Sequence, residues 1–481
     1  MTLPQRAYSI FRRITPHGYW VVTLLAGFLR FYNLGYPKSL VFDETYYVKD
    51  AWTLWKHGFE TNWPTNPNAA FEAGHVNTYL SSGSFIVHPP LGKWLIALPM
   101  ALFGPENSWT WRYTTAIFGT AAVLLLMLVA KKLSGSQSFA ILAGLLFAID
   151  GHAIVLSRIA LLDGILMFFA LLAFYFLLLD REKTRVRYQV MAVRGRASVI
   201  WNRPWLVACA LALGAATSVK WSGAYFALFF GAYVVVSEAL YLRRNRIAGW
   251  QWAGARQALA DVALMLPAYA LVYLASWTGW ILAAGGYDRT SSPNWLQALI
   301  NYHQAIYNFH VNLHIPHPYA SNPLTWLLLG RPVAFYYVSQ PCPQLPYGCS
   351  SAIDAVGNPL IWWGALAAVL YLTWRYLRHG NRTDGLVLLG IAAGYLPWLA
   401  YMNRTVFQFY AIAFEPYLIL GLVLVIRGLW YSKPGGATRR LLMWYFMAVA
   451  ATSVFFLSLW WGFTTPYLFW IAHMWLGPLW I

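Results

Sequence analysis

The sequence predicts an all-α membrane protein that crosses a lipid bilayer many times. Of its 481 residues, 59% are hydrophobic and only 10% are charged, whereas about a quarter of the residues in soluble domains are charged. Apolar runs of about 20 residues, the length that a helix needs to cross a bilayer, recur along the chain. Aromatic residues make up 18% and include 27 Trp, as expected of rings at membrane interfaces. This composition excludes a disordered chain, a nucleic-acid-binding domain and an ordinary cytosolic enzyme.

About eleven segments are predicted to span the membrane, because charges, Pro or Gly end each apolar run. They are 17–34, 109–130, 136–156, 159–179, 204–219, 222–241, 258–282, 359–377, 385–401, 409–427 and 440–461. The first run lacks a small-residue cleavage site and leads directly into Arg30. We therefore expect an anchor there rather than a cleaved signal.

The net charge of +18 is explained by this topology rather than by a nucleic-acid partner. With the N-terminus in the cytoplasm, 23 of the 34 basic residues fall on the inner side, seven of them in the 181–203 loop. Only five of the 16 acidic residues lie on that side. Cytoplasmic loops of membrane proteins carry such an excess of Lys and Arg. We expect a multi-pass protein of the cell membrane whose inner face meets anionic lipids.

Two long loops, 35–108 and 283–358, fall on the outer side, so the chemistry is expected there. Loops that carry function are placed by a rigid scaffold. Cys342 and Cys349 lie in the second loop and are expected to form a disulfide in an oxidising compartment. Cys209 lies in a span and is expected to be a buried apolar side chain.

The first outer loop holds an adjacent acidic pair, Asp43 and Glu44. Gly35 and Pro37 end the preceding helix, which leaves the pair close to the outer interface. One carboxylate could accept the proton of an attacking hydroxyl, while the other orients a partner or a cation. The alternative is a solvated pair at the start of an amphipathic helix, because acids favour helix N-termini.

Further along this loop stands the block His88-Pro89-Pro90-Leu91-Gly92-Lys93. The two prolines favour an extended approach followed by a helix start. The helix after them is about 14 residues long, too short for a span, and fits an interfacial helix. Two interfacial helices in one loop would roof a cavity at the outer leaflet.

Several charged residues lie inside spans or at their outer ends, where charge is expensive and indicates function. They are Arg112, Arg158, Asp163, Lys220 (followed by Trp221) and Arg404. Basic side chains facing an outer-leaflet cavity suit a lipid phosphate. The alternative for Arg112 and Lys220 is snorkelling to the interface. A spacing of five residues argues against a direct pair between Arg158 and Asp163.

No internal nucleotide site and no familiar metal motif are present. His303, His310 and His314 recur at spacings that share one helix face, with His317 close by. A divalent metal is possible there but is not indicated, because no acid completes a motif. We expect this helix to pack polar groups against the catalytic loop.

Five motifs, in order, resemble those of the protein O-mannosyltransferases, membrane enzymes of the GT-C glycosyltransferase class, and match the actinobacterial branch. They are ValPheAspGlu (41–44), HisProProLeuGlyLys (88–93), SerArgIleAlaLeuLeuAsp (157–163), SerValLysTrpSerGly (218–223) and ArgThrValPheGlnPheTyr (404–410). The block 317–337 is similar to the second outer loop of bacterial members. The resemblance covers nearly the whole chain.

The resemblance implies inverting transfer of mannose from polyprenyl-phosphate mannose to Ser or Thr of proteins, and acceptors are expected near the Sec translocon. It implies that Asp43 acts on the acceptor hydroxyl and that Glu44 supports the loop or acceptor. Candidates for the donor phosphate are Arg112, Arg158, Lys220 and Arg404. Candidates for the pocket or acceptor are His88, Lys93, Asp163 and Trp221, with Asp163 a supporting partner.

The same resemblance divides the chain into a catalytic module, 1–282, and a second loop with a four-span module, 283–481. Eukaryotic members carry a β-rich MIR domain after the seventh span, but the segment here has only about 75 residues. Two alternatives stay open. One is a polyprenyl-phosphate-dependent transferase that acts on a lipid or cell-wall glycan. The other is a transporter, although no internal repeat is visible.

Overall fold

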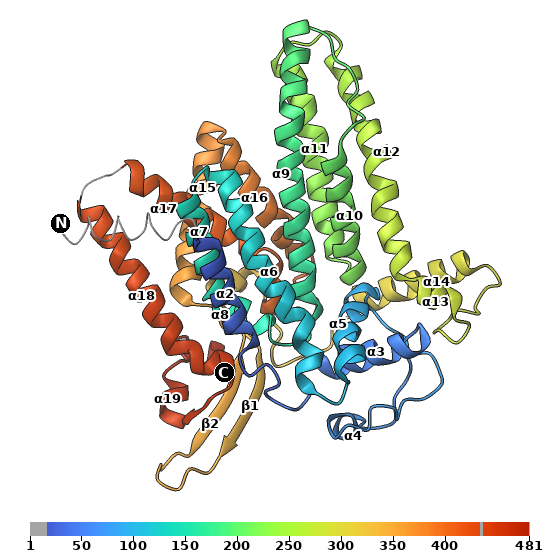
Figure 1. Ribbon diagram of the computed structural model, residues 1–481, viewed down its shortest axis with the longest axis vertical. Coiled ribbons are helices and arrows are strands. Elements are labelled where there is room, and N and C mark those ends of the chain that lie inside the picture. Colours follow the sequence, from blue (N-terminus) through green and yellow to red (C-terminus); the bar gives the residue numbers. More distant parts are fainter. Residues whose placement is uncertain (1–16, 433–435, 481) are drawn as a thin grey trace.

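The computed structural model describes residues 17–432 and 436–480. The predicted inner-side residues Arg6, Arg12, Arg13 and Lys433 lie outside this part. The chain folds into a long helical bundle (Figure 1). Its helices begin with α2 (Gly18–Phe31), α3 (Glu44–His57), α4 (Asn68–Glu72), α5 (Leu91–Phe103), α6 (Ser108–Ser134), α7 (Gln137–Ala148), α8 (Gly151–Leu156), α9 (Leu162–Arg194), α10 (Pro204–Val219) and α11 (Gly223–Arg244). They continue with α12 (Trp250–Ser276), α13 (Thr278–Leu282), α14 (Trp295–Val311), α15 (Pro359–His379), α16 (Arg382–Tyr395), α17 (Glu415–Ser432), α18 (Gly436–Trp461) and α19 (Tyr467–Ile471). Short 3-10 helices are η1 (Pro323–Leu328), η2 (Leu396–Tyr401), η3 (Gln408–Ala413) and η4 (Gly477–Trp480).

The protein is a multi-pass membrane protein. Within the described residues, seven helices are long and apolar enough to cross a bilayer: α6, α9, α11, α12, α15, α16 continued by η2, and α18. Four shorter apolar helices, α2, α5, α7 and α10, have 10 to 17 residues. Every predicted span contains helix, but the total of eleven crossings stays a prediction.

Two predicted spans differ in detail from the structure. The segment 136–156 is not one helix, because it breaks between α7 and α8 and Asp150 caps α8 by accepting a hydrogen bond from the His152 amide. Helix α9 starts at Leu162, later than expected, and continues to Arg194. More than half of the predicted basic loop 181–203 is therefore helical, since its Arg, Lys, Glu, Gln and Met residues are good helix formers.

The fold is mostly helical, as expected, but it also contains one small sheet. The second outer loop and the segment after α18 form a three-stranded antiparallel sheet, β1 (Ala334–Gln340), β2 (Cys349–Asp354) and β3 (Thr464–Pro466), in the order β1-β2-β3. Aromatic and β-branched residues in β1 suit a strand. Cys342 and Cys349 are joined by a disulfide with Cα atoms 5.7 Å apart, and Cys209 is free and buried.

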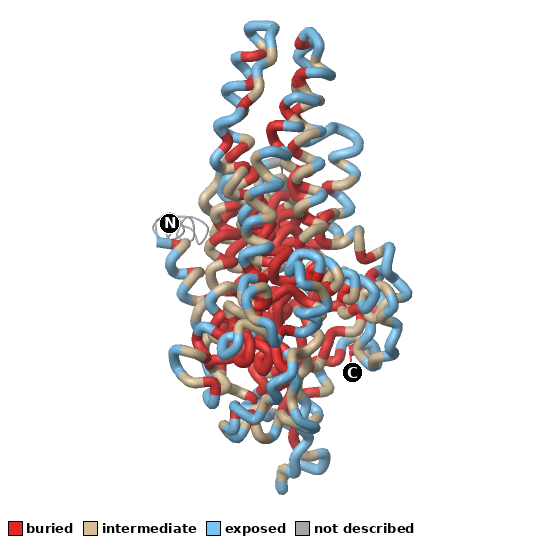
Figure 2. Tube along the Cα trace, turned by 90° about the vertical axis from the view of Figure 1, so that its right-hand side faces the viewer, coloured by how far each residue is buried: buried red, intermediate tan, exposed pale blue. Residues whose placement is uncertain are grey.

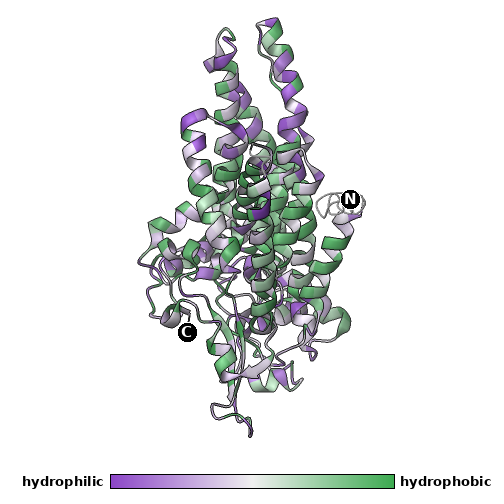
Figure 3. Ribbon diagram, turned by 90° about the vertical axis from the view of Figure 1, so that its left-hand side faces the viewer, coloured by the Kyte–Doolittle hydropathy of each residue, from purple (hydrophilic) through white to green (hydrophobic). Residues whose placement is uncertain are grey.

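The buried residues concentrate in the middle of the bundle, whereas the far tips of the long helices are exposed (Figure 2). Hydropathy follows the same division, with apolar residues around the centre and hydrophilic residues toward the tips (Figure 3). The largest fully buried side chains include Trp111, Trp326, Trp362 and Trp460. A rigid apolar centre of this kind can hold the outer loops in fixed positions.

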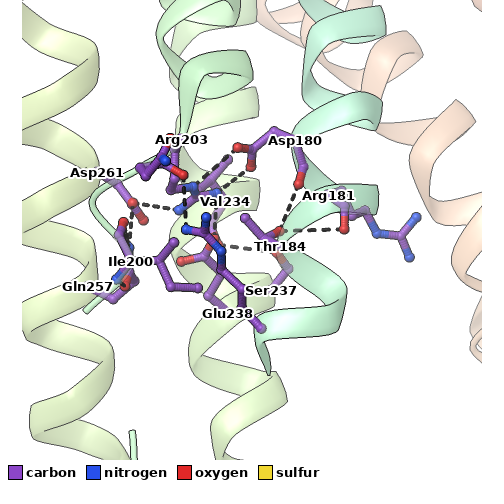
Figure 4. A network of polar contacts seen from close by, with 12 residues as sticks. Asp180, Arg181, Thr184, Ile200, Arg203, Val234, Ser237, Glu238, Gln257 and Asp261 are labelled. Atoms are coloured by element: carbon purple, nitrogen blue, oxygen red, sulfur yellow. Dashed lines mark hydrogen bonds and ion pairs between the residues drawn. The ribbon is translucent and has the colours of Figure 1, made fainter. Parts of the chain in front are cut away.

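A buried charge cluster ties together α9, α10, α11 and α12 (Figure 4). The Arg203 guanidinium pairs with Asp180 at 2.5 Å, Glu238 at 2.8 Å and Asp261 at 2.5 Å. The Gln257 amide also donates to Asp261 at 2.8 Å. Because buried ions need partners, this cluster aligns α9 with α10, α11 and α12, and the last three of these helices line the cavity described next.

Candidate active site

A cavity of about 450 Å³ opens where the first and second outer loops meet the ends of the helices. A volume of this order is typical of small-molecule sites. Its lining comes from the loop before α5, from α10, α11, α12 and α14, and from the segment after α16. The lining residues are His88, Thr217, Lys220, Trp221, Ser222, Ala224, Tyr225, Tyr269, Tyr273, His303, Tyr307, His310, Val311, Trp398, Tyr401 and Arg404.

Two cationic side chains line this cavity, and in the part of the chain that the structure describes only one of them is paired with a carboxylate. The Lys220 ammonium binds both carboxylate oxygens of Asp163, at 2.9 and 3.1 Å, and lies 4.0 Å from the centre of the Tyr410 ring. The half-buried Arg404 donates from Nη2 to His310 Nδ1 at 2.9 Å. No carboxylate of the described residues forms an ion pair with Arg404. No described carboxylate therefore neutralises the Arg404 guanidinium, which is available to an anionic ligand.

Histidines and aromatic rings form the wall beside these cations. His88 stacks on His310 with ring centres 5.4 Å apart, and Nδ1 of His88 bonds to no described residue. His310 Nε2 donates to the Val87 carbonyl at 2.9 Å, so its Nδ1 accepts from Arg404. Burial lowers the pKa of His310 to about 4 and lowers the pKa of His88 well below its usual value. Both rings are neutral at pH 7 and act as hydrogen-bonding groups.

Trp221 completes the wall through a hydrogen-bond chain. The Trp221 indole donates to the Tyr273 hydroxyl at 2.8 Å, and this hydroxyl lies 2.7 Å from His303 Nε2. The three side chains come from the α10–α11 turn, α12 and α14. These hydrogen bonds hold the rings in place as an aromatic surface of the kind that suits an apolar or sugar ligand.

Asp43 stands beside this cavity rather than in its lining. It is half-buried at the start of α3, and the Tyr47 hydroxyl donates to it at 3.4 Å. The Tyr47 ring lies 6.0 Å from the His88 ring, which does line the cavity. Burial raises the pKa of Asp43 to about 6, with the Lys220 charge opposing and the Asp163 charge adding to the rise. A carboxylate with this pKa is suited to accept a proton near neutral pH.

The neighbouring Phe42 fixes the position of Asp43. Its ring meets four rings of later segments at 5.4 to 5.8 Å between centres: His317, Phe335, Phe407 and Phe409. Phe42 has a φ of 48°, which is strained for a bulky residue. Such strain persists where the surroundings over-determine the backbone, as they do at functional sites.

Glu44 and Arg112 form a buried structural pair away from the cavity. Arg112 donates from Nε and Nη2 to the two Glu44 oxygens, both at 2.7 Å, and also donates to the carbonyls of Pro37 and Ser39. Glu44 accepts from the Ala160 amide at 2.8 Å. Both side chains are fully buried. The pair thus holds the first loop, and the structure does not bring Arg112 to the cavity.

Arg158 also binds groups outside the cavity, in this case backbone carbonyls. Its Nη1 donates to the carbonyls of Arg30 at 3.1 Å and Tyr32 at 2.6 Å, and its Nη2 donates to that of Asn33 at 3.3 Å. These carbonyls are at the end of α2, where no intrahelical donors remain. Arg158 lies before α9 rather than inside it. Of the four predicted phosphate ligands, only Lys220 and Arg404 line the cavity.

Lys93 lies behind the cavity wall. It is fully buried on α5 and forms an ion pair with Glu60 of the first loop. It is absent from the cavity lining and joins α5 to the segment that follows α3. Lys93 therefore stabilises the His88 block from behind the wall.

The predicted histidine face is only partly formed. His303 and His310 lie on α14, but this helix ends at Val311, so His314 lies beyond it and meets the Asn403 carbonyl at 2.9 Å. Within residues 17–432 and 436–480, no group of three His, Cys, Asp or Glu residues could hold a metal ion. The helix does pack polar groups against the first loop, through His310 and Val87.

Tyr47, Phe42 and Tyr273 were not identified from the sequence. A single aromatic residue in a chain with 31 Tyr and 28 Phe carries no distinguishing signal. Only contacts between distant segments reveal their roles. Tyr47 follows Asp43 by four residues on one helix, which could have indicated the contact.

Comparison with known proteins places this fold in a family. The family model described as dolichyl-phosphate-mannose-protein mannosyltransferase matches residues 20–278. A second model, the C-terminal four-span region of protein-O-mannosyltransferase, matches residues 295–479. The polyprenol-phosphate-mannose–protein mannosyltransferase of Mycobacterium tuberculosis is 33% identical over 451 residues, which cover 88% of this chain and 83% of that protein. The protein of the same name from Corynebacterium glutamicum is 30% identical and covers 97% and 94%.

Solved structures of glycosyltransferases share this fold. The Saccharomyces cerevisiae protein O-mannosyltransferase Pmt1–Pmt2 complex, bound to the sugar donor, aligns with a TM-score of 0.74 at 14% identity, over 96% of this chain and 92% of that one. The archaeal oligosaccharyltransferase AglB from Archaeoglobus fulgidus aligns with a TM-score of 0.52 at 13% identity, over 94% of this chain and 56% of that one. The fold is that of the GT-C glycosyltransferases, and the chain belongs to the dolichyl-phosphate-mannose-protein mannosyltransferase family.

Proposed function

We propose that this protein transfers mannose, with inversion, from polyprenyl-phosphate mannose to Ser or Thr hydroxyls of proteins. The observation that carries the proposal is that an arginine without a carboxylate partner among the described residues lines the aromatic cavity, while a carboxylate of raised pKa stands beside that cavity. Arg404 supplies the charge for a phosphate, and Asp43 supplies the base. The names of the relatives support mannose as the sugar and protein as the acceptor.

The residues suggest how the transfer proceeds. Asp43 takes the proton of the acceptor hydroxyl as its oxygen forms a bond to the sugar C1 atom. The bond from C1 to the phosphate oxygen breaks, and the electron pair leaves with the polyprenyl phosphate. Arg404 and Lys220 stabilise the charge that grows on this phosphate. Attack from the face opposite the leaving group inverts C1, so a β-linked donor gives an α-linked product.

Asp163, His88 and Trp221 have supporting roles in this proposal. Asp163 holds the Lys220 ammonium by its two oxygens. The neutral His88 and Trp221 shape the wall beside the reacting groups. Glu44 and Lys93 act at a distance by holding the loop that carries Asp43 and His88.

The direct test is an assay with the purified full-length protein. Radiolabelled polyprenyl-phosphate mannose and a peptide rich in Ser, Thr and Pro are supplied together, and label on the peptide is measured. Label that moves to the peptide supports the proposal. Label that moves only to a lipid or glycan acceptor would assign the protein to that class of transferase instead.

The rate of transfer is expected to depend on pH through Asp43. Only the carboxylate form accepts a proton, so kcat should be constant above the pKa of about 6 and decline as pH falls through it. One pH unit below that pKa, roughly a tenth of the carboxylate remains. A profile of kcat from pH 5 to pH 8 checks this. A profile that rises toward acid would contradict a basic role for Asp43.

Removal of the Arg404 charge is expected to weaken donor binding. Arg404→Gln should raise the KM for the donor about tenfold or more, because hydrogen bonds to charged groups contribute about 1.5–3 kcal/mol. Lys38→Gln is the matched control, since it removes one charge from an exposed first-loop residue that does not line the cavity. Equal effects of the two substitutions would mean that Arg404 acts only through the general surface charge.

We infer that the protein lies in the cell membrane with the cavity on the outer side. The basic residues of 181–203 and 243–256 lie on α9, α11 and α12 and on the segments between the helices, at the helix ends remote from α3 and α5 (Figure 1). This distribution supports a cytoplasmic location for those ends. Acceptors would then be secreted or membrane proteins, taken near the Sec translocon. Both proposed modules, 1–282 and 283–481, contribute residues to the cavity.

A further inference from the structure

The sheet of the second outer loop has an open edge. β2 pairs with β1 on one side and with β3 on the other, and no described strand pairs with the other side of β1. The outer half of β1, from Tyr337 to Gln340, is exposed, with Tyr337 at 44% and Val338 at 40%. The hairpin projects beyond the helices, with β1 on the side of α3 and α4 (Figure 1).

The register of β1 shifts between Ala334 and Tyr336, but the strand beyond this irregularity carries no charge or proline that would prevent pairing with other chains. Natural edge strands carry Lys, Pro or inward-pointing charges. The β1 sequence AlaPheTyrTyrValSerGln has none of them. The four exposed and uncharged residues at the outer end of β1 are therefore a template for an added strand.

The inner end of β1 contacts Phe42, the residue before the candidate catalytic carboxylate. Phe335 on β1 meets Phe42 with ring centres 5.4 Å apart, and Phe42 precedes Asp43 in the sequence. Tyr36, just upstream, contacts Tyr336 on β1 at 5.7 Å and bonds to Ser351 on β2. A chain laid along the free edge of β1 would therefore run from the exposed hairpin toward Asp43.

We propose that the acceptor polypeptide binds in extended form as an additional strand on the free edge of β1, which delivers a Ser or Thr to Asp43. The proposal rests on the proposed function and specifies how its protein substrate is held. Main-chain hydrogen bonds provide the affinity in strand addition. The absence of charge on β1 fits acceptors that share a hydroxyl but little other sequence.

The first test uses two acceptor peptides of identical sequence with different backbone methylation. Neighbouring amides of a strand point to opposite edges, so N-methyl groups at every second residue block one edge only. One set should raise the KM for peptide at least about tenfold, because each main-chain hydrogen bond that is lost weakens binding and several are lost together. The alternate set should leave the KM nearly unchanged. Equal effects of both sets would overturn the proposal.

The second test requires no catalysis, so it separates this proposal from the proposed function. Val338 on β1 and Thr464 on β3 pair with the same residue, Ser351, from opposite edges of the sheet. Each is replaced in the full-length protein by a photo-crosslinking residue, Val338→p-benzoylphenylalanine or Thr464→p-benzoylphenylalanine. A labelled Ser/Thr peptide should crosslink several times more to the β1 variant.

The outcomes are distinct. Equal crosslinking at the two edges, or more at Thr464, would overturn strand addition even if mannose transfer occurs. Selective crosslinking at Val338 without mannose transfer would support peptide binding on β1 and contradict the proposed function.

Discussion

Asp43→Asn is expected to lower kcat for mannosyl transfer at least about a hundredfold, the usual contribution of a general base. Asn has the shape of Asp but cannot accept the acceptor proton. The Tyr47 hydroxyl can still donate to the amide oxygen, so the start of α3 should keep its geometry. The measurement is transfer of label from polyprenyl-phosphate mannose to peptide, with kcat and the two KM values determined separately.

The pattern of the kinetic constants distinguishes chemistry from folding. Both KM values should change little, since Asp43 does not line the cavity. Any residual rate should lose the dependence on pH near 6. Unchanged kcat in Asp43→Asn would leave the family membership intact but remove Asp43 from its role. Tyr47→Phe provides a milder control that keeps the carboxylate and removes one hydrogen bond.

Arg112→Met is expected to destabilise the protein by about 3–5 kcal/mol, the usual result of breaking a buried ion pair. The substitution leaves the buried Glu44 carboxylate without its two 2.7 Å hydrogen bonds and leaves the Pro37 and Ser39 carbonyls without a donor. The first loop, which carries Asp43, should loosen first. The free energy of unfolding in detergent micelles, determined by denaturant titration, measures the effect.

Two further variants test the cause of this loss. Arg112→Met combined with Glu44→Gln removes the unpaired charge and should recover part of the stability. Lys132→Met breaks an exposed ion pair with Glu182 and should change stability by only about 0–1 kcal/mol. A stable Arg112→Met variant with a raised KM for donor would instead assign Arg112 to the phosphate.

The membrane class could be predicted from the sequence because hydropathy is a local property. Each apolar run reports its own length and its flanking charges, whatever the rest of the chain does. The predicted spans therefore all contain helix, while the three-stranded sheet was missed. β1 is short, and its pairing with β2 and β3 depends on contacts with segments far along the chain.

For the site, the sequence by itself determined which residues were available: an acid pair, the His88 block and four outer-face cations. Tertiary structure alone decided which of them meet. Arg112 pairs with Glu44, 68 positions away, and Arg158 binds the Tyr32 carbonyl, 126 positions away, so both are withdrawn from the cavity. Lys220 and Arg404 line it instead. The physical reason is that a buried charge takes its partner from whatever segment packs against it, and periodicity along one segment contains no information about that neighbour.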